Sequence, residues 1–263
     1  MSVLSYLENL ASFLNIAENE ALSIDCSIDT LHGRLGNYFV NGELKEQFKF
    51  GSSVRSTMLP RNADSRSDVD YMIVFSNVSN CKPQTFIARL KRFAESSYST
   101  SEVSQSSPTV VLALGHIKFD LVPSYRDWNS LYIPAHRTSY TDWIPTDPLS
   151  FNNTVKQANK NNKFMLKPMI RLLKYWNANN DYIYESYLLE QKMAAASFPS
   201  CNNLKDYLFS AINNFDIWAL PDHKRSKVER AMRIVINVRQ YEQLGHLLSS
   251  ETEIKKLLPE LQA

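Results

Sequence analysis

The sequence of 263 residues has few cysteines, few glycines and no long apolar run. Its three cysteines are odd in number and far apart, at Cys26, Cys81 and Cys201, which argues against a disulfide framework and a thiolate zinc site. No apolar stretch approaches the roughly 20 residues that span a bilayer, so we expect no membrane insertion. The first 33 residues contain no Lys or Arg, and a secretory signal needs a basic start. We therefore expect a cytoplasmic protein.

The composition that remains is that of a soluble globular protein. Hydrophobic residues make up 44% of the chain and charged residues 21%, and the length allows one large domain or two lobes. The net charge of +2 is too small to imply nucleic-acid binding by itself. The placement of the charges is therefore more informative than their sum.

Apolar periodicity changes along the chain from helical to β-type and back. The pattern predicts helices over 2–17 and 23–38, strands over 70–75, 109–114 and 116–122, a helix over 85–96, and further helices over 152–162, 163–177, 186–195, 203–214 and 224–247. This order predicts an α+β fold of two lobes: a small mixed β-sheet catalytic lobe with helices, and an all-helical lobe. We place the domains at 1–145 and 146–263.

Two carboxylates open the first predicted strand. Asp68 and Asp70 are two residues apart, and side chains alternate faces along a strand, so both project from one face. In the later strand, Asp120 lies between the apolar positions Phe119 and Leu121 and points to the opposite face from them. The three aspartates are thus candidates for one catalytic site.

Carboxylates held this close repel one another unless a cation or a proton compensates. Magnesium suits such a site because it prefers oxygen ligands and completes its shell with water and substrate phosphates. We expect two Mg²⁺ ions, with Mn²⁺ as an alternative, bound by Asp68, Asp70 and Asp120. Such a site serves phosphoryl transfer, which needs mainly positioning and charge neutralisation.

A Gly-Ser pair precedes the carboxylates. Gly51 is one of only 6 glycines and falls between an extended run and a predicted short helix over 53–58. A glycine there allows close approach of a phosphate to the backbone, and Ser52 at the helix start can offer its hydroxyl and nearby N–H groups. Both residues are therefore candidate nucleotide contacts.

Each of these features alone has a simpler explanation. An Asp-x-Asp pair is more often a solvated turn, a Gly-Ser pair is nearly uninformative, and an isolated Asp120 would be a surface residue of an edge strand. Their occurrence in this order, each at a strand edge, favours the catalytic interpretation.

Together these residues resemble the nucleotidyltransferase superfamily of polymerase-β type. The stretch from Gly51 to Phe75 and the later segments 143–148, 166–177 and 186–190 are similar to the branch of oligoadenylate synthases, cyclic GMP-AMP synthase and the bacterial CD-NTases. The resemblance implies an active site in a cleft between the two lobes. It also implies that Lys174 and Ser186 contact the triphosphate and that Tyr187 stacks on the base.

A run of basic residues supports the assignment of Lys174. Six of them recur at spacings of three and four, and no Asp or Glu occurs between Pro148 and Asn180: Lys156, Lys160, Lys163, Lys167, Arg171 and Lys174. Such spacing predicts one basic stripe, which Pro168 would divide between two helices. A solvated helix face is the alternative.

The resemblance implies a magnesium-dependent enzyme that joins nucleoside triphosphates, ATP above all, into a cyclic or short linear oligonucleotide second messenger and releases pyrophosphate. We expect it to serve bacterial anti-phage defence, with an effector or regulatory protein encoded nearby. One alternative is nucleotide transfer to a tRNA end or a protein hydroxyl, as in toxin-antitoxin systems. In the tRNA case an oligonucleotide is the acceptor of the reaction and not its product. Another is a degenerate nucleotide-binding module, which would require a broken metal site.

Overall fold

A computed structural model of the chain describes residues 1–76, 81–106, 108–135 and 142–261, which form two compact units. The sheet unit comprises Ala17–Ser56 and Arg66–Asn153, and the helical unit comprises Met1–Ile16, Thr57–Ser65 and Thr154–Ala263. These units differ from the predicted domains 1–145 and 146–263, because the first helix and the segment 57–65 pack with the C-terminal helices. The last two residues of the second predicted domain lie outside the described residues.

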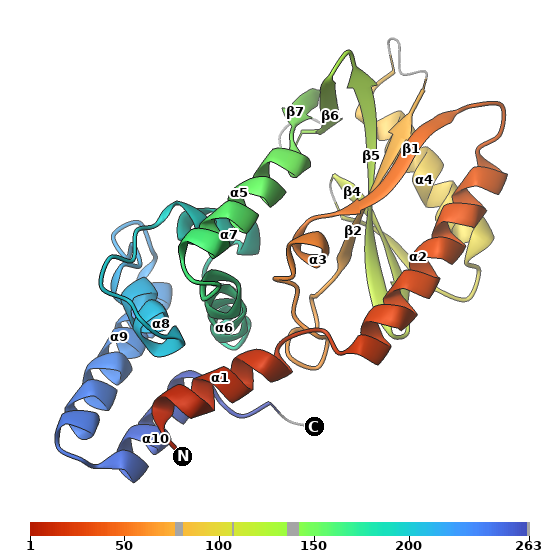
Figure 1. Cartoon of the computed structure of the whole chain (residues 1–263). Helices are drawn as coiled ribbons and strands as arrows, with labels where there is room; N and C mark the ends of the chain where they lie inside the picture. The colour runs from red at the N-terminus through yellow and green to blue at the C-terminus, as the bar shows by residue number, and fades with distance from the viewer. Residues whose placement is uncertain (77–80, 107, 136–141, 262–263) are drawn as a thin grey trace. The chain divides into compact units, whose positions relative to one another are not determined.

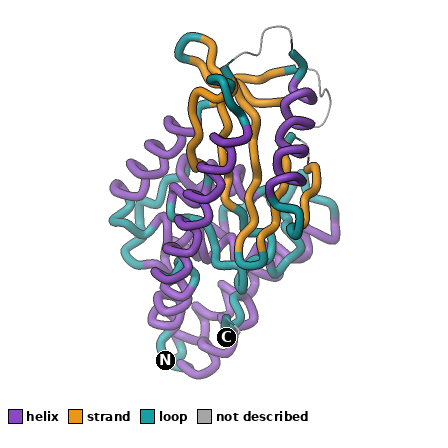
Figure 2. Tube along the Cα trace, turned by 90° about the vertical axis from the view of Figure 1, so that its right-hand side faces the viewer, coloured by secondary structure: helices purple, strands orange, loops and turns teal. Residues whose placement is uncertain are grey.

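The sheet unit is built on one mixed sheet (Figures 1 and 2). Its strands are β1 (Leu44–Phe50), β2 (Val69–Phe75), β3 (Glu102–Ser106), β4 (Thr109–Leu114), β5 (Ile117–Asp127), β6 (Ser130–Pro134) and β7 (Trp143–Thr146). The order is β1-β2-β5-β4-β3, and β6 pairs with both β5 and β7. Strands β2 and β5 are parallel, and the other pairs are antiparallel.

The two faces of this sheet carry different residues. Helices α2 (Glu18–Tyr38) and α4 (Pro83–Ser97) pack on the face of Tyr71 and Phe75: the Phe75 and Phe86 rings lie 4.7 Å apart, and His32 Nδ1 is 3.1 Å from the Tyr71 hydroxyl. Because side chains alternate, Asp70 projects from the opposite face. The sheet thus buries one face under helices and presents carboxylates on the other.

The helical unit encloses its own apolar core (Figure 1). It contains α1 (Val3–Phe13), α6 (Leu166–Ala178), α7 (Ser186–Ala195), α8 (Leu204–Asn213), α9 (Asp222–Gln243) and α10 (Leu247–Leu257), and α5 (Pro148–Asn161) runs from the sheet unit into it. Leu7 and Leu14 of the N-terminal segment are fully buried in this core, and the Tyr6 hydroxyl donates to the Leu258 carbonyl at 2.6 Å. The two ends of the described chain are therefore packed together.

These elements confirm the predicted α+β fold class and correct several boundaries. The break between α5 and α6 lies at 162–165, where Lys163 and Phe164 adopt φ of 53° and 63°, whereas Pro168 sits inside the first turn of α6. The helix predicted over 224–247 is α9, which ends at Gln243; α10, which was not predicted, begins at Leu247 after Gly245 at φ 76°. Strands β3, β6 and β7 were not predicted, since they are short or lack clear alternation.

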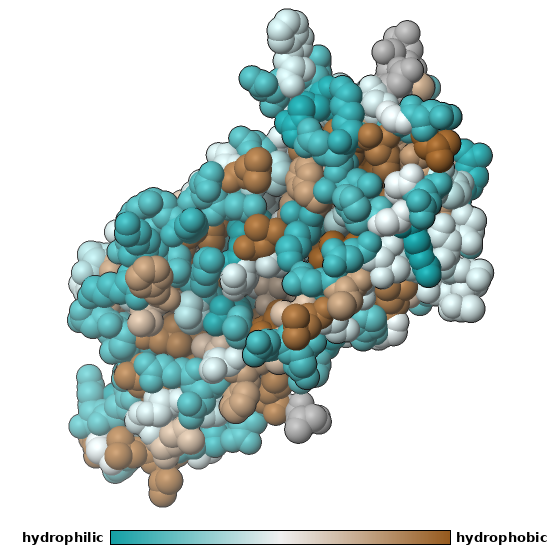
Figure 3. All heavy atoms as spheres, turned by 45° about the vertical axis from the view of Figure 1, so that its right-hand side comes forward, coloured by the Kyte–Doolittle hydropathy of each residue, from teal (hydrophilic) through white to brown (hydrophobic). Residues whose placement is uncertain are grey.

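Figure 3 shows a surface on which polar residues predominate and apolar residues are scattered among them. Within the described ranges, none of the helices combines the length and the apolar character that crossing a bilayer requires.

Candidate active site

The register of β2 against β5 pairs two of the predicted aspartates directly. Asp70 is the partner of Asp120 across the parallel pair, and Val69 pairs with Phe119. Asp68 precedes β2 by one residue and so shares the face of Asp70. Residues 50 positions apart in the sequence are thereby brought together, with their carboxylates on the sheet face opposite α2 and α4.

Gly51 lies against the Asp70 carboxylate. Phe50 of β1 pairs with Asp70 of β2, and the chain then turns at Gly51 with φ 75° into the four-residue helix α3 (Ser52–Arg55). A Cβ added to Gly51 would lie 1.8 Å from Asp70 Oδ2, far inside contact distance. Glycine is therefore required for two reasons: the positive φ favours it, and a side chain would clash with the Asp70 carboxylate. The sequence had suggested only that glycine allows a phosphate to approach the backbone.

Lys118 lies on the carboxylate face and was not predicted. It precedes Asp120 by two residues in β5, and its Nζ is 3.5 Å from Asp68 Oδ2. Its charge also favours the ionised form of Asp120. A lysine two residues from a candidate aspartate in a strand is the signal that could have identified it.

Asp120 has a buried carboxylate oxygen. Its Oδ1 is buried without a hydrogen-bond partner among the described residues, and Oδ2 accepts only a long bond of 3.5 Å from the Thr109 hydroxyl. Burial raises the pKa of Asp120, against the opposing effects of Lys118 and of the Thr109 hydroxyl. An unpaired buried carboxylate oxygen is costly, so it calls for a cation or a proton.

The donor set fits a hard divalent cation. Asp68, Asp70 and Asp120 offer only carboxylate oxygens, and one of these, Asp120 Oδ1, is already free of hydrogen bonds in the described part of the chain. As the side chains stand, no cluster of three or more Asp, Glu, His or Cys residues in that part is closed around a metal position. A cation here would compete with the Lys118 ammonium for Asp68.

Ser52 is the first residue of α3, beside the carboxylates. The Ser53 hydroxyl donates to the Phe50 carbonyl at 3.0 Å, which holds the turn closed. At the end of α3, Arg55 is buried, with its guanidinium 4.8 Å from the Phe151 ring centre and 3.3 Å from Asn152 Oδ1. The segment that follows β1 is thus fixed on both sides of Ser52.

Lys174, Ser186 and Tyr187 belong to the helical unit. Lys174 Nζ lies 3.2 Å from Glu190 Oε1, and the two side chains are 7% and 1% exposed. Ser186 begins α7 four residues before Glu190 and is half-buried, whereas Tyr187 is 51% exposed. The carboxylates and Gly51-Ser52 are therefore gathered in one unit, and these three residues lie in the other.

The predicted single basic stripe is not present, because its members differ in burial. Lys156 and Lys160 are exposed on α5, while Arg171 and Lys174 are buried in α6. Arg171 donates to the Ala11 carbonyl at 3.2 Å, and burial lowers its pKa. The last two cations of the run are thus built into the helical unit.

Glu190 is the second residue that the sequence did not assign. It lies in a segment that carries the family resemblance, yet its partner is sixteen residues earlier and in another helix. The absence of acidic residues between Pro148 and Asn180 was the available signal. A lysine in so apolar a helix needs a carboxylate from elsewhere if it is buried.

The domain family described as "Second Messenger Oligonucleotide or Dinucleotide Synthetase domain" matches residues 1–159, more than half of the 263 residues. The chain belongs to this family. Its members are named for the synthesis of nucleotide second messengers. This membership confirms the resemblance drawn from Gly51, Ser52 and the aspartates.

Among characterised synthetases, the chain is 23% identical over 151 residues to a cyclic AMP-AMP-AMP synthase from Acinetobacter sp. (strain ATCC 27244 / 9458). The match spans 57% of this chain and 43% of that protein. The chain therefore aligns with less than half the length of that relative.

Solved structures of other proteins share the fold of this chain. E. coli MS115-1 CdnC with ATP superposes with a TM-score of 0.69 at 13% identity, covering 97% of this chain and 98% of that one. A complex of CdnC with HORMA-deltaN gives 0.65 at 14% identity and the same coverage. At these identities the likeness establishes the fold alone.

Proposed function

We propose that this chain is a magnesium-dependent nucleotidyltransferase that joins nucleoside triphosphates into a cyclic or short linear oligonucleotide second messenger and releases pyrophosphate. The observation that carries the proposal is the pairing of Asp70 with Asp120, beside Gly51, with Asp120 Oδ1 left without a partner among the described residues. A fold has little reason to maintain this arrangement for stability. It suits a reaction centre that becomes neutral only when it is loaded.

Asp68, Asp70 and Asp120 would hold the two ions. When bound, magnesium would neutralise the triphosphate, activate the attacking hydroxyl and stabilise the leaving pyrophosphate. The backbone at Gly51 and Ser52 orients Asp70 and borders the space where phosphate oxygens would lie. When the metal ions bind, the Lys118 ammonium would separate from Asp68 and would remain as a positive charge on the same face of the sheet.

Lys174, Ser186 and Tyr187 are proposed to contact the nucleotide, and this part rests on the family resemblance. Lys174 is paired with Glu190, so a triphosphate would share its ammonium with that carboxylate. Tyr187 is exposed enough to offer a ring face to a base. Ser186, at the first turn of α7, can donate its hydroxyl to a phosphate.

We further propose ATP as the favoured substrate and bacterial anti-phage defence as the setting. The names of the relatives support ATP as the substrate and a second protein as the partner. One relative is a cyclic AMP-AMP-AMP synthase, and CdnC was solved with ATP and with HORMA-deltaN. A regulatory or effector protein encoded nearby is the corresponding partner for this chain.

The direct test is incubation of the purified chain with Mg²⁺ and each of the four ribonucleoside triphosphates, alone and mixed. Pyrophosphate release is measured, and products are identified by mass spectrometry. A new cyclic or linear oligonucleotide supports the proposal. If nucleotide from the triphosphate appears only on added tRNA or protein, transfer to a macromolecule is favoured. No product with any triphosphate, with or without a candidate partner protein, would count against the enzyme.

A further inference from the structure

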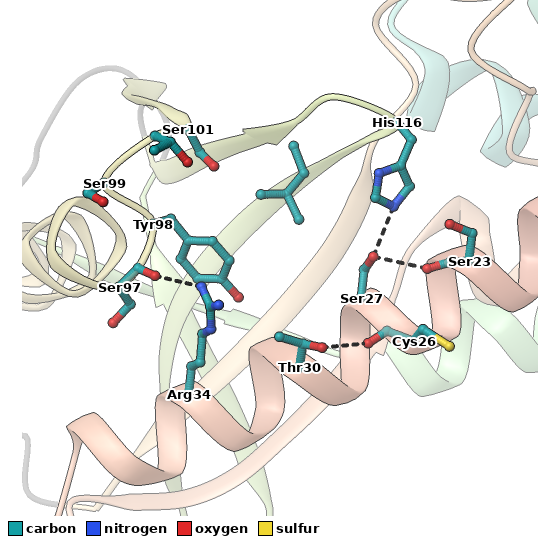
Figure 4. Close-up of a pocket in the computed structure, with 12 residues that line it drawn as sticks. Ser23, Cys26, Ser27, Thr30, Arg34, Ser97, Tyr98, Ser99, Ser101 and His116 are labelled. Atoms are coloured by element: carbon teal, nitrogen blue, oxygen red, sulfur yellow. Dashed lines mark hydrogen bonds between the residues drawn. The ribbon is translucent and has the colours of Figure 1, made fainter.

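A polar cavity of about 530 Å³ lies in the sheet unit, away from the carboxylate face (Figure 4). One wall is α2, another is the end of α4 with the residues that follow it, and the third is the turn between β4 and β5. Its volume is in the range of small-molecule sites. All lining residues belong to the sheet unit, so the cavity is complete within it.

The wall is rich in hydroxyls and contains no carboxylate. On α2 the lining residues follow one helix face, because they are spaced by three and four positions: Ser23, Cys26, Ser27, Thr30 and Arg34. Five more hydroxyl residues come from 97–101, and Leu114 and His116 complete the lining. Positive charge on this wall therefore meets no negative charge.

Arg34 is the fixed cation of the cavity. Its guanidinium lies 4.3 Å from the centre of the Tyr98 ring and donates to the Ser97 carbonyl at 2.6 Å. Among the described residues it has no ion pair; one of its five N–H groups bonds the Ser97 carbonyl, and its charge also acts on the Tyr98 hydroxyl. The remaining donors have the planar arrangement that binds phosphate in a bidentate manner.

Tyr98 supplies a second indication of a ligand. Its side chain is 8% exposed, and its hydroxyl is buried without a hydrogen-bond partner in the described part of the chain. It is the one polar side-chain atom of the cavity wall in that condition. An unpaired buried hydroxyl is uncommon in folded proteins and marks a place where a bound molecule can complete the hydrogen bonding.

His116 faces Arg34 across the cavity (Figure 4). Its Nε2 is 3.0 Å from the Ser27 hydroxyl, which itself lies 2.9 Å from the Ser23 carbonyl and donates to it. The hydroxyl then accepts from Nε2–H, and the other ring nitrogen, Nδ1, is turned toward the cavity. This nitrogen is therefore available for a hydrogen bond with a ligand.

We propose that this cavity binds a small phosphate-bearing anion, at a site separate from the catalytic carboxylates. Arg34 supplies the positive charge, and His116 on the opposite wall and the serine and threonine hydroxyls supply hydrogen bonds. An extended polyanion such as nucleic acid does not fit, because α2 carries Glu18, Glu20 and Asp29 along the same helix. The concentration of donors in one surface hollow favours a compact ligand.

Occupancy of this site would be communicated along β5. His116 immediately precedes that strand, and two residues later Lys118 contacts Asp68 on the carboxylate face. Movement of His116 toward an anion would thus displace the start of the strand that holds Lys118 and Asp120. The expected role is regulation by a phosphorylated metabolite or by phosphate itself.

Cys26 provides a reporter of binding, since it is exposed and lines the cavity, while Cys81 is exposed elsewhere and serves as internal control. The rate of alkylation by iodoacetamide is measured at each thiol by peptide mass spectrometry, with inorganic phosphate, ribose 5-phosphate or ribose added at constant ionic strength. A phosphate ligand at about ten times its Kd slows Cys26 about tenfold. Cys81 and the ribose sample stay unchanged.

The variants Arg34→Gln and His116→Ala test the assignment, with Arg92→Gln on α4 as a matched control outside the cavity. Loss of the Arg34 charge should raise the Kd about tenfold or more, loss of the His116 ring should raise it by a smaller factor, and Arg92→Gln should leave it unchanged. Protection by ribose 5-phosphate alone identifies a phosphate monoester, and equal protection by inorganic phosphate identifies the free ion. No selective protection of Cys26, or equal protection in Arg34→Gln, overturns the proposal.

Discussion

The carboxylate face of the sheet unit and the Lys174–Glu190 pair of the helical unit treat buried charge in opposite ways. Lys174 and Glu190 are almost fully enclosed and neutralise each other at 3.2 Å. On the sheet, like charges face each other across the Asp70–Asp120 pair, and one oxygen of Asp120 has no partner among the described residues. The buried charges of Lys174 and Glu190 are neutralised within the protein, whereas the Asp120 carboxylate still needs a cation or a proton.

The difference separates what each region contributes. A satisfied buried ion pair fixes the packing of α6 against α7 and is costly to break. Carboxylates that share one face of a sheet are costly to keep ionised and are useful only when a cation binds. Substitutions should therefore reduce stability in the helical unit and reduce activity, at a gain in stability, on the sheet.

The largest effect is expected at the metal-binding carboxylates. Asp68→Asn combined with Asp70→Asn should lower the rate of pyrophosphate release by about 10³-fold or more while the fold is kept, because the amides cannot hold the ions. Steady-state rates and circular dichroism measure both. Asp127→Asn, at the exposed end of β5, is the control and should stay near wild type. Persistent activity of the double variant would refute the metal assignment.

The next effect concerns the ion pair. Lys174→Met or Glu190→Gln should each lower the free energy of unfolding by about 3 to 5 kcal/mol, since either leaves a buried charge or polar group unpaired. The double variant Lys174→Met/Glu190→Met should recover much of this loss. Urea denaturation measures all three.

The exposed pair Lys91–Glu95 gives the comparison, at 3.8 Å. Removing it should change the free energy of unfolding by about 0 to 1 kcal/mol. Losses of similar size at both pairs would show that Lys174 and Glu190 are solvated in solution.

Two glycines with positive φ distinguish strain from steric conflict. Gly42 and Gly51 have φ of 71° and 75°, but a Cβ at Gly42 meets nothing within 4 Å, whereas at Gly51 it meets Asp70 Oδ2. Gly42→Ala should cost about 1 kcal/mol from the backbone alone. Gly51→Ala should cost about 2 to 4 kcal/mol and displace Asp70, with loss of activity. Equal stability and activity of the two variants would contradict the close approach.

The smallest effect is a gain in stability that depends on pH. Burial raises the pKa of Asp120 above its ordinary value of 3.8. At a pH between 3.8 and this raised pKa, the folded state therefore binds more protons than the unfolded state. Metal-free protein then loses stability as pH rises through the raised pKa. Asp120→Asn should remove this loss and raise the stability at neutral pH by about 1 to 2 kcal/mol, in the presence of a chelator.

Thermal melting of both proteins from pH 4 to pH 8 tests this. The difference between them should grow with pH, and it should shrink when Mg²⁺ is added. A variant that is less stable than wild type throughout would mean that the Asp120 carboxylate is already neutralised in the folded protein.

The sequence revealed the parts of this site that depend on local order. Alternation placed Asp68 and Asp70 on one face, and the apolar neighbours of Asp120 assigned it to a strand. The pairing of β2 with β5 in a register that sets Asp70 against Asp120 could not be read from the sequence, because register depends on the strands between and around them. The resemblance to the nucleotidyltransferases supported the grouping of Asp120 with Asp68 and Asp70 without knowledge of that register.

Other features depend on contacts between distant residues. The role of Gly51 rests on the Asp70 carboxylate nineteen positions away, and the environment of Lys174 rests on Glu190 in another helix. Helix limits were predicted in part. The break between the helices predicted over 152–162 and 163–177 is confirmed where Lys163 and Phe164 adopt positive φ, whereas the division at Pro168 is wrong, because this proline lies in the first turn of α6. A proline is tolerated there because its missing N–H would have no partner within the helix.

The central claim is that Asp68, Asp70 and Asp120 hold the ions. Titration with Mn²⁺ followed by electron paramagnetic resonance, in the presence of a non-hydrolysable ATP analogue, counts the bound ions directly. About two ions per chain should bind wild type, and the variant with all three aspartates changed to asparagine should bind neither. Equal binding by both proteins, or no binding to a wild-type chain that is catalytically active, would contradict the account.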